Sequence, residues 1–177
     1  NYYGGFTATE CLVKSGCKSL ITLTDEEGSV EFEERTRGFL EAQKALGLDS
    51  KNSQIHRGPC GFEFGYNFIM NNRGLLQKTD GIFAQADMNA IGAIEAMKEL
   101  GIRVPEEVAV VGYDDIDIDL YFKPRLTTIH QPKEMYSEIA CRKLVDLIEN
   151  KNTEKLIQKI VKPELLIRES CIIREQH

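Results

Sequence analysis

The feature that most constrains the fold is the alternation of short apolar runs with helical patterns of ten or more residues. Strands that alternate with helices of this length pair in parallel through right-handed crossovers. The sequence therefore predicts a doubly wound, parallel α/β sheet with flanking helices. The expected helices are 7–15, 32–46, 64–76 and 88–100, and the expected strands are 19–23, 53–57, 81–86 and 108–112.

The C-terminal part departs from this alternation. A β-branched run at 126–130 is stopped by Pro132 and precedes a long helical pattern at 133–150. A last strand is expected near 164–169, after a polar connector at 151–155. We interpret this connector as a loop rather than as a linker between domains.

Composition limits the classes of protein that need to be considered. With 42% hydrophobic and 28% charged residues, the chain has the composition of a soluble globular protein. Its net charge of −6 makes it a poor candidate for gripping nucleic-acid phosphates by itself. The N-terminal residues lack the basic and apolar pattern of a signal peptide, and no run of 18 apolar residues predicts a membrane span.

Cysteine usage points to a reducing compartment. The five cysteines are scattered and odd in number, which favours free thiols in the cytoplasm over a disulfide framework. No Cys or His spacing is typical of zinc, so we expect no metal site. The five are Cys11, Cys17, Cys60, Cys141 and Cys171.

Ligands of a doubly wound sheet bind beyond the carboxyl ends of its strands. Four loops qualify, at 24–34, 58–64, 86–89 and 113–119, and one arginine among several carboxylates is typical of polyol recognition. For any single acidic residue, a solvated loop charge is the plainer interpretation, and Asp87 is placed to cap the helix that follows it. The polar residues at this edge are Asp25, Glu26, Glu27, Arg35, Asp87, Asn89, Asp114 and Asp115.

Catalytic interpretations have little support. The sequence has no GxGxxG or GxxxxGK[ST] phosphate loop and no Ser/His/Asp order. Cys60 lies in a Gly-Pro-Cys-Gly turn, and nothing in the sequence predicts the lowered pKa that an activated thiol needs. We therefore expect no catalytic residues, no cofactor and no enzyme.

Four segments, in this order, resemble the LacI/GalR family of bacterial transcription regulators. The third of them matches the family pattern D-x-x-A-x-G-A…G-x-x-V-P, and the second matches R-x-x-G-F/W. The segments are Ala8–Leu12 with Gly16, Arg35–Phe39, Asp87–Ala93 continuing to Pro105, and Val110–Asp115 with Leu126–Pro132.

The resemblance implies an effector site. Arg35 matches the arginine that usually holds the effector, and Asp114 matches a carboxylate that pairs with effector hydroxyl or amine groups. Cys60 stands where many members have a stacking aromatic, and Ala86 where sugar-binding members place a polar group. These two departures remove a stacking face and a hydrogen bond, each worth about 1 kcal/mol. Asp87 completes the expected site.

The same resemblance implies a periplasmic-binding-protein-like fold of type I that is truncated. Residues 1–127 would form the second subdomain of the effector-binding core. Residues 128–150 would form a crossover and a helix belonging to the first subdomain, and 151–177 the return strand. The family's DNA-binding domain and the start of its first subdomain are not in this sequence. We expect the apolar face of the helix 133–150 to be under-covered.

The implied function is effector sensing by a cytoplasmic transcriptional repressor. A small, sugar-like ligand would modulate DNA binding, and operator DNA would be contacted only through an N-terminal domain. The subunits would pair as a homodimer, although core packing explains Met97 and Leu100 equally well. The expected interface residues are Ile94, Met97, Leu100, Tyr121 and Phe122.

Two alternatives stay open at this point. A periplasmic sugar-binding protein of a transporter has a similar fold, but the cysteines and the 126–132 segment count against it. A hydrolase that uses Asp114 has no motif in its favour.

Overall fold

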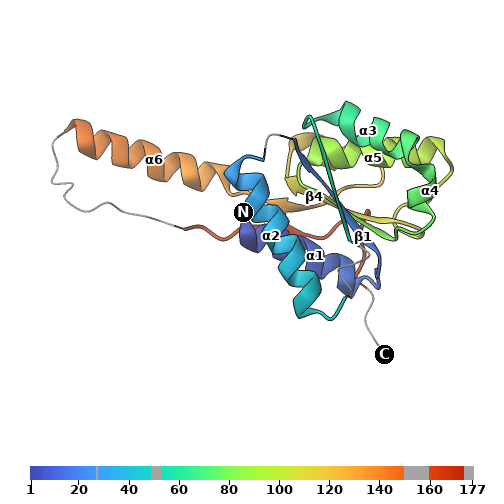
Figure 1. Cartoon of the computed structure of the whole chain (residues 1–177). Coiled ribbons are helices and arrows are strands. Elements are labelled where there is room, and N and C mark those ends of the chain that lie inside the picture. Colours follow the sequence, from blue (N-terminus) through green and yellow to red (C-terminus); the bar gives the residue numbers. More distant parts are fainter. Residues whose placement is uncertain (27, 49–52, 150–159, 174–177) are drawn as a thin grey trace.

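The computed structural model describes residues 1–26, 28–48, 53–149 and 160–173, and Figure 1 shows a sheet with helices on both faces. The strands are β1 (Leu20–Asp25), β2 (Gln54–Gly58), β3 (Gly81–Ala84), β4 (Ala109–Asp114), β5 (Thr127–His130) and β6 (Glu164–Leu166). The helices are α1 (Tyr2–Lys14), α2 (Val30–Ala45), α3 (Phe62–Asn71), α4 (Arg73–Leu76), α5 (Asp87–Glu99), the 3-10 helix η2 (Asp117–Leu120) and α6 (Lys133–Ile148).

The six strands form one sheet in the order β2-β1-β3-β4-β5-β6. The first five are parallel, whereas β6 pairs antiparallel with β5. The predicted doubly wound α/β class is therefore confirmed. Strands β3 and β4 are apolar and buried almost throughout, as expected when helices cover both faces of a parallel sheet.

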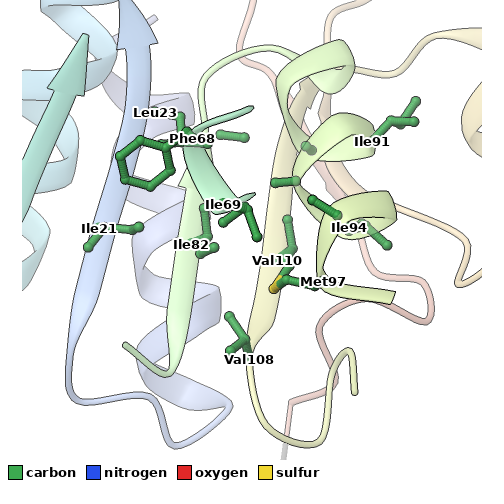
Figure 2. Close-up of a cluster of buried hydrophobic side chains, with 14 of the residues drawn as sticks. Ile21, Leu23, Phe68, Ile69, Ile82, Ile91, Ile94, Met97, Val108 and Val110 are labelled. Atoms are coloured by element: carbon green, nitrogen blue, oxygen red, sulfur yellow. The ribbon is translucent and has the colours of Figure 1, made fainter. Parts of the chain in front are cut away.

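Alternate strand residues divide the core into two layers, because successive side chains point to opposite faces. Ile82 and Val110 face α3 and α5, where Figure 2 shows them beside Ile94 and Met97 of α5. Phe83 and Val111 belong to the other layer, which is covered by α1 and α2. The carboxyl ends of β1, β3 and β4 thus emerge at one edge, between the two helix pairs.

Two helix boundaries differ from the sequence prediction. Helix α1 begins at Tyr2 rather than at residue 7, so it includes Gly4 and Gly5 despite their poor helix propensity. The predicted helix 64–76 is split into α3 and α4 at Asn72, whose φ of −123° and ψ of 38° are not helical. Tertiary packing decides the first difference and the local backbone decides the second.

Helices α1 and α2 touch backbone to backbone. A Cβ atom on Gly38 would collide with the carbonyl oxygen of Tyr2, and one on Gly5 would collide with that of Arg35. Neither position has room for a methyl group. This close approach determines where α2 lies, and therefore where Arg35 meets the sheet.

Helix α6 projects away from the sheet (Figure 1), and none of its described residues is buried. Leu144, Leu147 and Ile148 are 58%, 50% and 71% exposed, and Ile139 is half-buried. The prediction of an under-covered apolar face is confirmed. The predicted polar loop at 151–155 lies outside the described residues.

Three further observations concern the described part of the chain. None of the five cysteines forms a disulfide there. Within the described ranges, no helix has both the length and the apolar character to cross a bilayer. Among the same residues, no cluster of three or more His, Cys, Asp or Glu side chains is arranged to hold a metal ion.

Gly38→Ala tests the contact between α1 and α2. Because the added methyl group meets backbone, the helices must separate, and we expect the free energy of unfolding to fall by about 1–3 kcal/mol. Urea-induced unfolding measures this change. Gly74→Ala is the matched control, since a Cβ there meets nothing within 4 Å, and it should leave stability unchanged or slightly higher. Equal stability of the two variants would contradict the tight contact.

Candidate functional site

Arg35 lies at the carboxyl edge of the sheet and is only 6% exposed. Its Nη1 donates to the carbonyl oxygen of Gln85 at 2.5 Å, and its Nε donates to Oδ1 of Asn1 at 3.1 Å. The guanidinium carbon lies 3.7 Å from the ring centroid of Tyr113 and 4.7 Å from that of Phe32. A buried charge is costly unless its surroundings compensate it. These contacts compensate the Arg35 charge, and they hold the side chain in one position.

Gln85 ties the Arg35 region to the sheet. Its Oε1 accepts a hydrogen bond from Thr24 at 2.9 Å, and its Nε2 donates to Thr36 at 2.8 Å and to Thr22 at 3.1 Å. All four side chains are buried. Gln85 was not among the predicted site residues, although a glutamine directly after the buried strand 81–84 is a usable signal for a buried polar network.

Asp114 ends β4 with a φ of 122°, and Asp115 follows with a φ of 53°. Such strained conformations persist only where the surroundings hold them. Asp114 accepts a hydrogen bond from Nε2 of Gln131 at 2.6 Å, and its Oδ1 lies 3.9 Å from Nη2 of Arg35. Burial raises the pKa of Asp114, and the Arg35 charge opposes this effect. The structure thus brings the two main predicted site residues together.

Asp115 is not the loop charge that was expected. It receives hydrogen bonds from Nη2 of Arg168 at 2.5 Å and pairs with Nδ1 of His130 at 2.7 Å. Burial alone would raise the pKa of Asp115, but the hydrogen bonds from Arg168 and His130 outweigh it and the net shift is downward. The expectation failed because Arg168 is 53 residues away in sequence and reaches the loop only through the fold.

Asp87 does not cap α5, so that expectation was also wrong. The N-cap position is Ala86, and the Asp87 side chain points into the protein at 1% exposure. Its Oδ1 accepts a hydrogen bond from Thr128 at 2.6 Å, and its Oδ2 accepts one from the Ile116 amide at 3.1 Å. Gly112 is needed here because a Cβ on it would collide with Oδ1 of Asp87. Asp87 therefore fastens the loop after β4.

Cys60 is exposed in the turn after β2. Burial, followed by the charges of Asp114 and Asp25, raises the pKa of its thiol, which does not favour a nucleophile. The next residue, Gly61, donates its amide to Oδ1 of the buried Asn89 at 2.7 Å. Asn89 therefore holds the turn that carries Cys60.

The remaining residues at this edge contribute less. Ala86 is buried and offers no side-chain hydrogen bond. Asp25 is half-buried at the end of β1, and Glu26 is exposed. Glu27 lies outside the described residues.

The residues expected at a subunit interface differ in their exposure. Met97 is fully buried in the core, and Ile94 is 1% exposed and lines a pocket of about 320 Å³. Neither side chain protrudes to meet a partner. Leu100 and Phe122 are half-buried, and Tyr121 is 82% exposed. A surface interface in this region would therefore depend on the last three.

The arrangement suits recognition more than catalysis. It offers a fixed cation, an acceptor in Asp114 with a raised pKa and the Gln131 amide, all at the open edge of the sheet. A pocket of about 670 Å³ near Asp80 and Val108 lies at the other ends of β3 and β4 and contains none of these residues.

Comparison with known proteins decides the family. The model of the periplasmic binding protein-like domain matches residues 9–171. The chain belongs to this family. Among curated relatives, the transcriptional repressor PurR of Mannheimia succiniciproducens is 34% identical over 96% of this chain. The transcriptional regulator CelR of Thermobifida fusca is 31% identical over 96% of it. The resemblance to LacI/GalR regulators is thereby confirmed.

Solved structures agree with this placement. A LacI family regulator of Enterococcus faecium with bound ribose superposes with a TM-score of 0.89 at 25% identity, covering 98% of this chain and 64% of that chain. The CelR–cellobiose complex gives a TM-score of 0.83 at 32% identity, covering 96% of this chain and 52% of that chain. These relatives and neighbours are transcriptional regulators, a non-enzymatic family.

The chain spans about half the length of the curated relatives it matches. The match covers 51% of the Mannheimia PurR and 50% of the Thermobifida CelR. The match therefore covers only part of the proteins whose activities are known, and it does not by itself assign those activities to this chain.

Gln85→Leu tests whether the buried network supports the site. The substitution leaves the Thr24 and Thr36 hydroxyls without their partner, so we expect the free energy of unfolding to fall by about 1–3 kcal/mol. Urea-induced unfolding provides the measurement. Gln77→Leu, at an exposed position, should change stability by less than about 0.5 kcal/mol. A Gln85→Leu protein as stable as the wild type would show that the network contributes nothing.

Proposed function

We propose that this chain is the effector-sensing part of a LacI/GalR-type transcriptional repressor that acts in the cytoplasm. Its ligand would be a small sugar or sugar derivative, and ligand binding would modulate the affinity of the protein for operator DNA. The observation that carries the proposal is the pair formed by Arg35 and Asp114, whose charged atoms lie 3.9 Å apart at the carboxyl edge of the sheet.

The chemistry of this pair suits a polyol. The planar guanidinium and carboxylate groups can each make paired hydrogen bonds to neighbouring hydroxyls. Arg35 is held by Gln85 and Tyr113, and Asp114 by Gln131, so neither group has to be ordered when a ligand arrives. Two neighbours of similar fold were solved with ribose and with cellobiose, which supports the sugar class.

We assign residues 1–127 to the second subdomain of the effector-binding core. In this assignment the segment 128–150 crosses to a first subdomain, and 151–177 returns. Two observations support it. Helix α6 leaves the sheet with its apolar side chains exposed, and β6 comes back to pair with β5. The uncovered face of α6 is the surface that a first subdomain would bury.

Ligand-driven closure of two subdomains would then change the relative placement of paired subunits. Such a change biases DNA binding when the two geometries differ in their affinity for the operator. Contact with DNA would be made by an N-terminal domain outside the present sequence, which agrees with the net charge of −6.

Asp114→Asn tests the ligand-binding role. The substitution keeps the shape and the contact with Gln131 but removes the charge, so we expect sugar affinity to fall about 10-fold or more. Calorimetry on the complete gene product that contains this chain, with ribose and cellobiose as probes, measures the change. Glu106→Gln, an exposed carboxylate at the other edge of the sheet, is the control. Binding of neither sugar, or equal affinity in both variants, would contradict the proposal.

We also propose that the protein forms a homodimer through the surface around Tyr121, Phe122 and Leu100. Tyr121 is a large aromatic side chain that is 82% exposed, and Phe122 and Leu100 are half-buried. Aromatic residues of this kind are enriched at the centres of protein interfaces.

Tyr121→Asp tests this surface. A charge at the centre of an apolar contact opposes association, so we expect the dimer dissociation constant to rise at least about 10-fold. Sedimentation equilibrium measures that constant. Tyr3→Asp, which places the same charge at an exposed tyrosine on α1, should leave it unchanged. Equal dissociation constants for the two variants would argue against the interface.

A further inference from the structure

Asp119, on the 3-10 helix η2, is a fully buried carboxyl group that the effector site does not use. It is 0% exposed, and neither of its oxygens accepts a hydrogen bond from the described residues. The nearest cation is Nη1 of Arg168, 3.9 Å from its Oδ2, which is beyond hydrogen-bond distance. A buried ionised carboxylate in this condition would be strongly unfavourable.

A second carboxyl group, that of Asp87 at the start of α5, meets the same turn, because Asp87 accepts a hydrogen bond from the Ile116 amide and the Asp119 amide donates to the Ile116 carbonyl oxygen at 3.0 Å. Each of the two carboxyl groups shifts the pKa of the other as a hydrogen-bond partner. Two carboxylates have no donor between them, so they can form a hydrogen bond only if one of them holds a proton. Asp87 already accepts bonds from Thr128 and from the Ile116 amide, and both of these favour its ionised form. The proton therefore belongs on Asp119.

We propose that Asp119 is a positioning residue that stays protonated at neutral pH and donates its proton to Asp87. This hydrogen bond joins η2 to the N-terminus of α5. Together with the Ile116 amide, it attaches the loop of residues 114–119 to Asp87 at two points. That loop carries Asp114, so the shared proton holds the ligand-binding carboxylate in place. Loss of the proton would put two negative charges together in the interior and loosen the loop.

The charged surroundings support this placement of the proton. Burial, the hydrogen bond with Asp87 and the Asp87 charge raise the pKa of Asp119 to about 8. Arg168, which follows β6, opposes this rise, and Asp115 at the end of β4 adds to it. Arg168 donates its hydrogen bond to Asp115 rather than to Asp119, and Asp115 also pairs with His130 of β5. Asp117, on the same 3-10 helix, is exposed.

The direction of the pH effect follows from linkage. An aspartate in the unfolded chain has a pKa of about 4. Between about pH 4 and the folded value of about 8, the folded state holds one more proton than the unfolded state. Stability from this group is complete below that window and is lost as pH rises through it. Asp119→Asn should remove this dependence, because its amide is a permanent, uncharged donor of similar shape.

The test compares the wild-type chain with Asp119→Asn and Asp117→Asn by thermal unfolding from pH 6 to pH 9. The melting temperature of Asp119→Asn minus that of the wild type is the quantity of interest. We expect this difference to increase by about 3 °C or more from pH 6 to pH 9. Asp117→Asn removes the same charge from an exposed position of η2, and its melting temperature should follow that of the wild type at every pH.

A second readout reports on the loop itself. In the wild type, the protection factor of the Ile116 amide against hydrogen exchange should fall at least about 10-fold between pH 6 and pH 8.5. The amide should stay protected in Asp119→Asn. No ligand is added, so the result is independent of the proposed sugar-sensing function.

Three outcomes would overturn the proposal. The first is that Asp119→Asn follows the pH profile of the wild type, and the second is that the Ile116 amide behaves alike in both proteins. Failure of Asp119→Asn to fold at any pH would also refute it, because a neutral donor of the same shape should replace a protonated acid.

Discussion

The burial of one cation governs the arrangement of side chains at the carboxyl edge of the sheet. The Arg35 guanidinium lies among the Tyr113 ring, the Phe32 ring, the Gln85 carbonyl oxygen and the Asp114 carboxylate, which come from three different parts of the chain. A buried charge is tolerated only when its surroundings compensate it, so α2, the end of β3 and the end of β4 must keep their relative positions. The backbone contact between Gly5 and Gly38 and the hydrogen bonds of Gln85 make that arrangement rigid.

A second polar cluster holds the loop after β4 from the opposite side of the sheet. Asp87 fixes the Ile116 amide, while Arg168 and His130 fix Asp115. Arg168 follows β6 and His130 ends β5, and helix α6 lies between these two strands in the sequence. Under the proposed assignment of subdomains, both connections to the first subdomain therefore contact the loop that carries Asp114. A change in their position would act directly on Asp115 and, through it, on the neighbouring Asp114.

Much of the fold was predictable because periodicity is a local property. Runs such as 108–112 and the helical spacing of 88–100 showed which elements form, and their alternation predicted parallel pairing. The antiparallel β6 and the start of α1 at Tyr2 were not predictable in this way, since packing against distant residues decides both. The site followed the same division. Arg35 and Asp114 meet as expected, whereas Asp87 and Asp115 took other roles, and Gln85, Arg168 and Asp119 were missed.

The sequence by itself determined the α/β class, the edge of the sheet where polar groups gather, and the family, because each of these depends on local patterns or short motifs. The tertiary structure alone decided which carboxylates are exposed, paired or protonated. Thr128 lies 41 residues from Asp87, and Arg168 lies 53 residues from Asp115. The charge state of an acidic residue depends on burial and on the groups within a few ångströms, and the chain brings those groups together only when it is folded.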